Sequence, residues 1–275
     1  MSVADTHALL EQFKQSFFAE PTKVDECLGM LPKLKIAVAK FPSLHPLCTH
    51  EISPQELMLA RETYELATLL SVKAQDVASF ERHLAKAKTL YNDYNTIHSH
   101  GQSVSMPKSE RQNLILGLNL LFLLSQNRMA EFHTEMELIP LEMHSTIFIE
   151  HPVRLEQYLM EGSYNKVVAA QREVPADSYH FFMGILVETV RDEIADCCER
   201  AYEQLDLTDA QKMLMCESPE QLAEYIAVRD TERGWSVHGS TLTFDSLGGD
   251  SSSAVLSEQL IVRSLEYAKE LERIV

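Results

Sequence analysis

Glycine is scarce in this sequence, with 9 residues in 275, and proline is not abundant at 10. β-Sandwiches and doubly wound sheets need many tight turns, so this scarcity disfavours both classes. The 5 cysteines follow no regular spacing. A secretory signal has a charged segment followed by an apolar core, and the start of the chain shows no such pattern. We therefore expect free thiols in a reducing compartment, the cytoplasm and the nucleus.

Positive charge is also in short supply. There are 24 Lys and Arg against 41 Asp and Glu, a net charge of −17. A field of that sign repels phosphate, which predicts no nucleic acid and no anionic membrane as partner. The most apolar stretch, Leu114 to Ser125, is shorter than the ~20 residues that a membrane-spanning helix needs.

Helical periodicity fills the first two thirds of the chain. Apolar residues recur there at spacings of three and four, as in amphipathic helices. We expect residues 1–180 to form an α-solenoid of tetratricopeptide-like helical hairpins, although the consensus residues of the classical repeat are absent. Pro32 predicts a kink or a break near Leu31, and Pro152 predicts the start of a helix that runs to Gly162.

Residues 181–246 change in character and predict a winged helix. The pattern indicates a long helix from Phe181 to about Leu205, a short helix over 210–216 and a third from Pro219 to Arg229. Trp235 to Val237 and Leu242 to Phe244 then alternate as two strands around a Gly239-Ser240 turn. Three helices followed by a β-hairpin is the order of elements in a winged helix.

The charge of this winged helix argues against DNA. Acids outnumber bases by five between Thr208 and Asp250, and the third helix opens with Glu217, Glu220 and Glu224. Such a face would repel backbone phosphates. The exposed edge of the wing could instead pair with a strand of another protein.

A flexible linker is predicted over 247–252 and a terminal helix over 253–275. One half of that helix is apolar and is expected to dock into a bundle of several helices; the alternative is that it folds back onto its own domain. Its apolar residues are Leu256, Leu260, Ile261, Leu265, Ala268, Leu271 and Val275.

The sequence offers no convincing catalytic, cofactor or metal site. It contains no glycine-rich phosphate loop, and Gly249 to Ser253 reads as linker rather than as a nucleophile elbow. His98 and His100 resemble half of an H-x-H-x10-D zinc site, but Arg111 stands where the aspartate should be. His45, Cys48 and His50 lack a matching second pair, and Cys197-Cys198 are adjacent on a helix. A metal-dependent hydrolase is the disfavoured alternative, and zinc analysis would test it.

Several phrases in the sequence resemble one family. They are Ser163-Tyr-Asn-Lys-Val, Pro175 to Phe182, Glu217-Ser-Pro, Gly234-Trp-x-Val and Leu242-x-Phe. Together with the layout of helical repeats, winged helix, linker and terminal helix, they resemble the PCI-domain proteins, in particular lid subunits of the proteasome regulatory particle. PCI subunits of the signalosome or of a translation initiation factor are the alternative.

The resemblance implies a non-catalytic structural and assembly subunit of a hetero-oligomer that supports ATP-dependent degradation of ubiquitinated proteins. In that family, winged helices of neighbouring lid subunits join edge to edge, and the C-terminal helices gather in one bundle. The interface residues expected here are Trp235, Val237, Leu242 and Phe244 in the wing, together with the apolar half of the terminal helix.

Overall fold

A computed structural model describes residues 3–19, 24–44, 53–99, 109–216, 218–233, 235–244 and 257–272. Within these ranges the chain is mainly helical and has a small three-stranded sheet. The chain divides into two compact units, Met1–Thr189 and Val190–Val275, with the division inside helix α10 (Tyr179–Ala201). The predicted fold class, helical with a winged helix, is confirmed.

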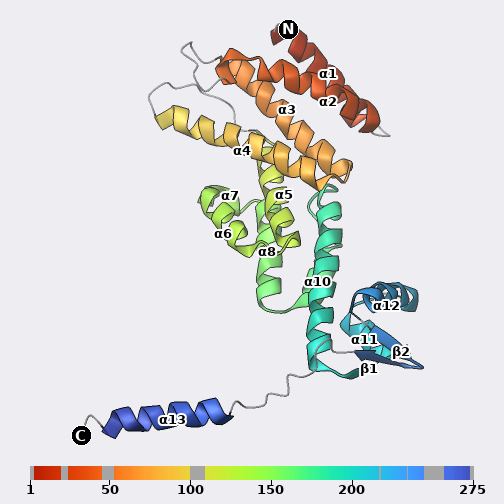
Figure 1. Cartoon of the computed structure of the whole chain (residues 1–275). Helices are drawn as coiled ribbons and strands as arrows, with labels where there is room; N and C mark the ends of the chain where they lie inside the picture. Colours follow the sequence, from red (N-terminus) through yellow and green to blue (C-terminus); the bar gives the residue numbers. More distant parts are fainter. Residues whose placement is uncertain are drawn as a thin grey trace. The chain divides into compact units, whose positions relative to one another are not determined.

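The first unit is built from helices that pack against one another in succession. Helix α1 packs against α2, α3 against α4, and α5 against α8 (Figure 1). The elements are α1 (Val3–Phe18), α2 (Val24–Ala39), the 3₁₀ helix η1 (Pro42–Leu44), α3 (Pro54–Lys73), α4 (Val77–Ser99), α5 (Gln112–Ser125), α6 (Met129–Leu138), α7 (Leu141–His144), α8 (Ile147–Met160) and α9 (Tyr164–Ala170). The first part of α10 completes this unit. None of the helices in the described ranges is long and apolar enough to cross a membrane.

Three phenylalanine rings from α4, α5 and α10 form the centre of this unit. The ring centroids of Phe80 and Phe122 are 5.4 Å apart, those of Phe80 and Phe182 4.9 Å, and those of Phe122 and Phe182 5.6 Å. All three side chains are buried. Helix α5 is buried from Ile115 to Ser125, because it is apolar on nearly every side and other helices cover it.

Pro152 lies inside α8 rather than at the start of a helix, which corrects the prediction. Proline has no backbone N–H, so the carbonyl of Phe148 loses its usual helical partner. The Tyr179 hydroxyl donates a hydrogen bond to that carbonyl at 3.0 Å. Gly117 of α5 makes room for this contact: a Cβ there would lie 2.1 Å from the Tyr179 hydroxyl oxygen.

A kink or a break was predicted near Leu31; there is no break, because α2 runs through Pro32 from Val24 to Ala39. Leu31 and Leu34 on either side are buried, and this packing offsets the lost hydrogen bond. Pro32 itself is exposed. Leu28, whose carbonyl loses its partner, is partly exposed as well.

The second unit is the winged helix. It contains the end of α10, β1 (Gln204–Asp206), α11 (Leu207–Met213), α12 (Pro219–Arg233), β2 (Trp235–His238), β3 (Thr241–Phe244) and α13 (Ser257–Glu272). The hairpin is confirmed: β2 pairs antiparallel with β3, with Trp235 opposite Phe244 and His238 opposite Thr241. Gly239 adopts a φ of 68°, which suits the tight turn.

The helix expected to reach Leu205 ends at Ala201, because the following residues form β1. Strand β1 pairs with β3, so the strand order is β1-β3-β2 and β3 is central. The predicted linker over 247–252 lies outside the described residues. The boundaries predicted for the domains stay a prediction.

Helix α12 is fastened to α10 by a buried arginine. The Arg229 side chain is 7% exposed, and its guanidinium pairs with Asp192 at 2.8 Å and Asp196 at 3.2 Å. The Tyr225 hydroxyl donates to the same Asp192 at 2.7 Å. Arg229 is thus paired within the fold.

Candidate protein-interaction surfaces

Most of the predicted wing residues lie inside the winged helix. Trp235, Leu242 and Phe244 are 1%, 0% and 8% exposed, whereas Val237 is 45% exposed. The Trp235 and Phe244 rings meet edge to face with centroids 4.9 Å apart. These three side chains therefore support the sheet from within. Strand β2 pairs with β3 along one edge. Within the described residues no strand pairs with its other edge, so the backbone of that edge could pair with a strand of another protein.

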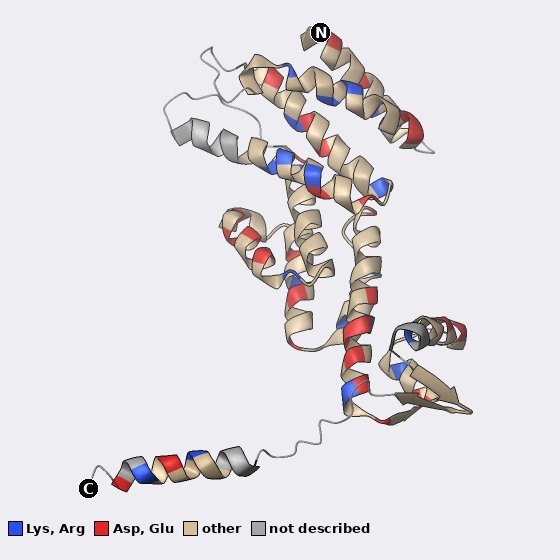
Figure 2. Cartoon of the chain, viewed as in Figure 1, with Lys and Arg blue, Asp and Glu red and all other residues tan. Residues whose placement is uncertain are grey.

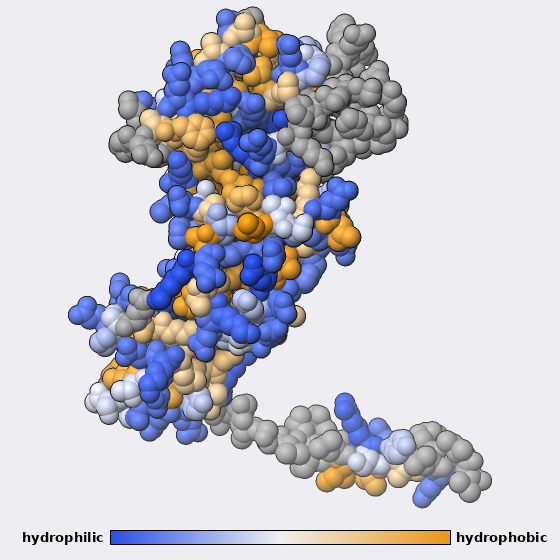
Figure 3. Space-filling model, turned by 180° about the vertical axis from the view of Figure 1, so that it is seen from behind, coloured by the Kyte–Doolittle hydropathy of each residue, from blue (hydrophilic) through white to orange (hydrophobic). Residues whose placement is uncertain are grey.

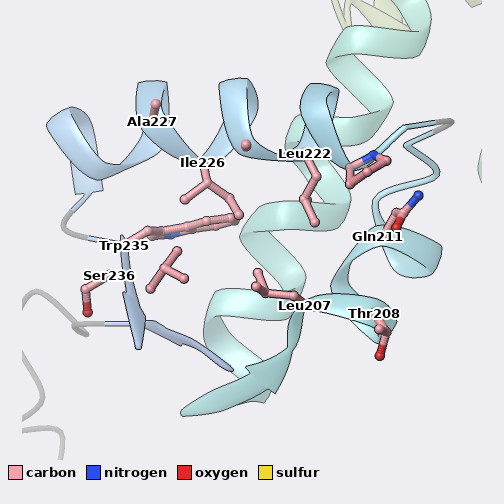
Figure 4. A pocket seen from close by; sticks show the side chains of 11 residues that line it. Leu207, Thr208, Gln211, Leu222, Ile226, Ala227, Trp235 and Ser236 are labelled. Atoms are coloured by element: carbon pink, nitrogen blue, oxygen red, sulfur yellow. The ribbon is translucent and has the colours of Figure 1, made fainter. Parts of the chain in front are cut away.

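A groove lies beside β2, between β2, α11 and α12 (Figure 4). Its volume is about 520 Å³, and its lining is mainly apolar: Leu207, Pro219, Leu222, Ile226, Trp235 and Val237. The indole Nε1 of Trp235 is buried and has no hydrogen-bond partner in the described part of the chain. A buried donor without a partner costs free energy.

Acidic side chains surround this unit. Glu220 and Glu224 are exposed on α12, and acidic residues gather along the second half of α10 (Figure 2). Two bases of this unit are paired with carboxylates: Arg229 with its two aspartates, and Lys212 with Asp209 at 3.1 Å. A surface of this charge repels phosphate.

Helix α13 presents apolar side chains to solvent. Ile261, Leu265 and Ala268 fall within one narrow sector of the helix at 100° per residue. The first two are 59% and 65% exposed, and Ala268 is exposed as well. Figure 3 shows hydrophobic atoms along one side of this helix and polar atoms along the other. Of the other predicted residues, Leu256 and Val275 lie outside the described residues, and nothing is described of the side chains of Leu260 and Leu271.

The described residues contain no group of three or more His, Cys, Asp or Glu side chains that could hold a metal ion. Cys197 is exposed and Cys198 buried, both as free thiols. His45, Cys48, His50, His100 and the segment Gly249 to Ser253 lie outside the described residues. Those predictions remain untested.

Three features escaped the sequence prediction: strand β1, the Arg229 clamp and the groove. A three-residue strand is too short to show an alternating pattern. The clamp does leave a signal, because Asp192 and Asp196 are four apart on α10, and Tyr225 and Arg229 are four apart on α12. The groove depends on how three elements pack and has no local signature.

Comparison with known proteins defines the family. The chain belongs to the CSN8/PSMD8/EIF3K family, whose model matches residues 110–247. It is 41% identical to the 26S proteasome non-ATPase regulatory subunit 8 homolog A of Arabidopsis thaliana over 269 residues, which cover 96% of each chain. It is 32% identical to the 26S proteasome non-ATPase regulatory subunit 8 of Caenorhabditis elegans, over 80% of this chain and 83% of the relative. With the 26S proteasome regulatory subunit RPN12 of Saccharomyces cerevisiae it shares 25% identity, over 90% of this chain and 92% of the relative.

Proposed function

We propose that this chain is a non-catalytic structural and assembly subunit of the lid of the proteasome regulatory particle, in the cytoplasm and the nucleus. Relatives named as proteasome regulatory subunits, aligned over nearly the whole chain, support this proposal. The observation that carries it further is the exposed apolar side of α13, since uncovered apolar area of this kind marks a surface that another polypeptide covers. By supporting the lid, the subunit contributes to ATP-dependent degradation of ubiquitinated proteins without chemistry of its own.

The first contact is made by α13, which docks into a bundle formed by C-terminal helices of other lid subunits. Burying a Leu or Ile side chain contributes about 1.5–3 kcal/mol. Burial of Ile261 and Leu265 together could therefore stabilise docking by several kcal/mol. The entropy lost when the tail becomes ordered offsets part of this gain.

The second contact is made by the wing, where a neighbouring PCI-domain subunit extends the sheet at the free edge of β2. The groove beside β2 supplies the apolar part of this interface, and Val237 lines it from the strand side. Backbone pairing gives affinity at such an edge, and the adjacent apolar surface gives specificity.

The tail contact is tested with Ile261→Glu combined with Leu265→Glu in the affinity-tagged full chain. We expect the double variant, like deletion of 253–275, to stay folded but to be lost from the complex in native co-purification. Arg263 is exposed and lies between the two apolar positions. Arg263→Glu changes the net charge by the same two units as the double variant, so it is the matched control and should be retained. Normal incorporation of the double variant would contradict the bundle role.

The wing contact is tested with Val237→Pro, which removes one backbone N–H of β2. We expect weaker pairing with the neighbour, whereas Val237→Thr, which keeps the N–H, should pair normally. Trp235 is the single tryptophan of the chain, so its fluorescence reports whether the winged helix stays folded. Ala223→Glu places a charge at the groove and should weaken pairing without touching the sheet. If both Val237→Pro and Ala223→Glu assemble normally, the wing has no such role.

The family name also includes signalosome and initiation-factor members, which leaves a second assembly as the alternative. The mass and composition of the complex that co-purifies with the full chain separate these assemblies. Recovery of other proteasome lid subunits supports the proposal, and recovery of signalosome or initiation-factor subunits contradicts it.

A further inference from the structure

Helix α2 has an outward face that the proposed function does not use. The helix lies near the start of the first unit, where one of its sides packs against α1 and α3 (Figure 1). At 100° per residue, the side opposite the buried residues is a sector of about 100° that carries no lysine, arginine or glutamate. We call this sector the outward face; its exposed uncharged residues are Leu28, Gly29, Pro32, Ile36 and Ala39.

An apolar outward face is unusual at the end of a stack of helices. The terminal repeat of such a stack normally has a polar outer side, which keeps the stack soluble. Helix α4 of the same unit has such a side, with Glu81, Arg82 and Lys86 exposed. On α2, by contrast, Leu28 is 43% exposed and Ile36 is 59% exposed. Exposed apolar side chains that lie together mark a surface that another polypeptide covers.

Pro32 contributes to this face in two ways. Its exposed ring lies between Leu28 and Ile36, which are each four residues away in the same helix, so the three form one apolar stripe. Proline also has no backbone N–H, so the Leu28 carbonyl lacks its usual helical donor. The outward face therefore combines an apolar stripe with a backbone acceptor that no helical N–H satisfies.

The charges around the outward face are separated along the helix. Asp25 and Glu26 lie in the first turn, and Lys33 and Lys40 are exposed toward the other end. Neither lysine forms an ion pair with any residue that the structure describes. At 100° per residue both lysines border the same edge of the outward face. An antiparallel helix with acidic residues in its first turns and basic residues in its last turns would match both ends, and the helix dipole favours this charge distribution.

The outward face is too small to hold two proteins together on its own. Helix α2 has 16 residues, so the face is about 24 Å long and about 10 Å wide. Stable interfaces bury about 800 Å² on each partner, which disfavours a dimer of two free copies of this chain. A face of this size suits a partner that other contacts already hold nearby. The inference therefore rests on the proposed function, in which the tail and the wing supply those contacts.

We propose that the outward face of α2 binds an amphipathic helix of a neighbouring polypeptide in the same complex, antiparallel to α2. The apolar stripe of that helix covers Leu28, Pro32 and Ile36, as in other complexes that recognise the apolar side of a helix. Acidic side chains near its N-terminus contact Lys33 and Lys40, and a basic side chain near its C-terminus contacts Asp25. These charges determine the direction and the register of the partner helix.

The test is photo-cross-linking in the native complex. The affinity-tagged full chain carries p-benzoylphenylalanine in place of Ile36, and the cross-linked segment is identified by mass spectrometry after native co-purification. We expect a segment of another polypeptide with apolar residues at spacings of three and four and with Asp or Glu near its N-terminal end. The same photoreactive residue in place of Ala85, which is exposed on α4, should not give this product.

Charge variants test how the partner is recognised. Lys33→Glu combined with Lys40→Glu should lower the yield of the cross-link about tenfold, because two attractive contacts become repulsive. Lys86→Glu combined with Lys166→Glu changes the net charge by the same amount at two other exposed lysines and should leave the yield unchanged. Leu28→Asp, which interrupts the apolar stripe, should lower the yield by a similar factor. All these variants should unfold at the urea concentration of the wild type, because the side chains are exposed.

Recovery of the complex tests the proposed function, and the cross-link within the recovered complex tests this inference. If no complex is recovered, both are contradicted. If the complex is recovered, three results overturn this inference alone. The first is that position 36 cross-links to no other polypeptide, or to a second copy of this chain. The second is a cross-linked segment without acidic residues near its N-terminal end. The third is an equal yield from the wild type and the double variant of Lys33 and Lys40.

Discussion

Helices α5 and α13 are both rich in leucine and isoleucine, yet they end in opposite environments. Every residue of α5 from Ile115 to Ser125 is buried, whereas the described side chains of α13, residues 261–269 and 272, are exposed. The polar residues explain the difference. Helix α5 has no charged residue, whereas α13 has charged residues on one half that can face water. An amphipathic helix can therefore remain exposed to water until a partner binds it, whereas an apolar helix must be buried within its own fold.

The comparison is sharpened most by Phe122→Ala in α5. Phe122 is 2% exposed and touches the rings of Phe80 and Phe182. Its truncation leaves a cavity, and we expect the free energy of unfolding to fall by about 3–5 kcal/mol. Urea denaturation followed by circular dichroism measures the loss, and Trp235 fluorescence reports the winged helix separately.

Phe18→Ala is the matched control for that experiment, because Phe18 is 59% exposed. Its truncation should lower the free energy of unfolding by less than about 1 kcal/mol. Equal losses for the two variants would show that the three-ring cluster is not the centre of the unit.

The second test of the comparison between buried and exposed helices uses a polar residue. The helical unit buries some polar side chains together with hydrogen-bond partners. His83 of α4 is 7% exposed. Its Nε2 contacts the Lys35 ammonium, and its Nδ1 lies 3.0 Å from the Ser71 hydroxyl and 3.2 Å from the Ala67 carbonyl. Burial, with help from Lys35 and Arg82, lowers the pKa of His83 to about 4, against smaller opposing effects of the Ala67 carbonyl and Asp76.

The lowered pKa predicts a loss of stability in mild acid. The unfolded chain binds a proton at His83 below about pH 6.5, whereas the folded chain does not until about pH 4. The folded state is therefore penalised as the pH falls through this window, by about 1 kcal/mol between pH 7 and 5.5. The measurement is urea denaturation at the two pH values, and His83→Gln should lose about 1 kcal/mol less than the wild type.

His133→Gln serves as control, because His133 has a 57% exposed side chain. It should retain the pH dependence of the wild type. If His83→Gln also keeps that dependence, the imidazole does not stay neutral in the folded protein.

Periodicity and turn chemistry predicted most of the elements. Helix α6 runs from Met129 to Leu138 as expected, and the hairpin turns at Gly239-Ser240 between the expected strands. These elements are set by residues close in sequence. The prolines were harder, since their outcome depends on distant groups: Pro152 is accommodated because Tyr179, 27 positions later in the chain, supplies the missing donor.

The interaction surfaces could be predicted only in part, for the same reason. The apolar half of α13 is visible in the sequence, because a helix displays its stripe at a fixed period. The sequence alone does not tell which wing side chains are buried and which are exposed. Trp235 and Val237 occupy equivalent positions in the alternating pattern, but they are 1% and 45% exposed. Two of the groove's walls come from α11 and α12, and neither helix alone indicates that a groove forms between them.

The smallest expected effect is the one that tests the comparison most directly. Ile261→Glu with Leu265→Glu should leave the stability of the isolated chain within about 0.5 kcal/mol of the wild type, because both side chains already lie in water. The measurement is again urea denaturation followed by circular dichroism and by Trp235 fluorescence. If the free energy of unfolding falls by more than about 2 kcal/mol, the two side chains are buried against the rest of the chain in solution, because only buried Leu and Ile side chains cost that much when they are replaced. In that case the exposed side would not be a surface kept for a partner, and the difference between α5 and α13 would be one of degree.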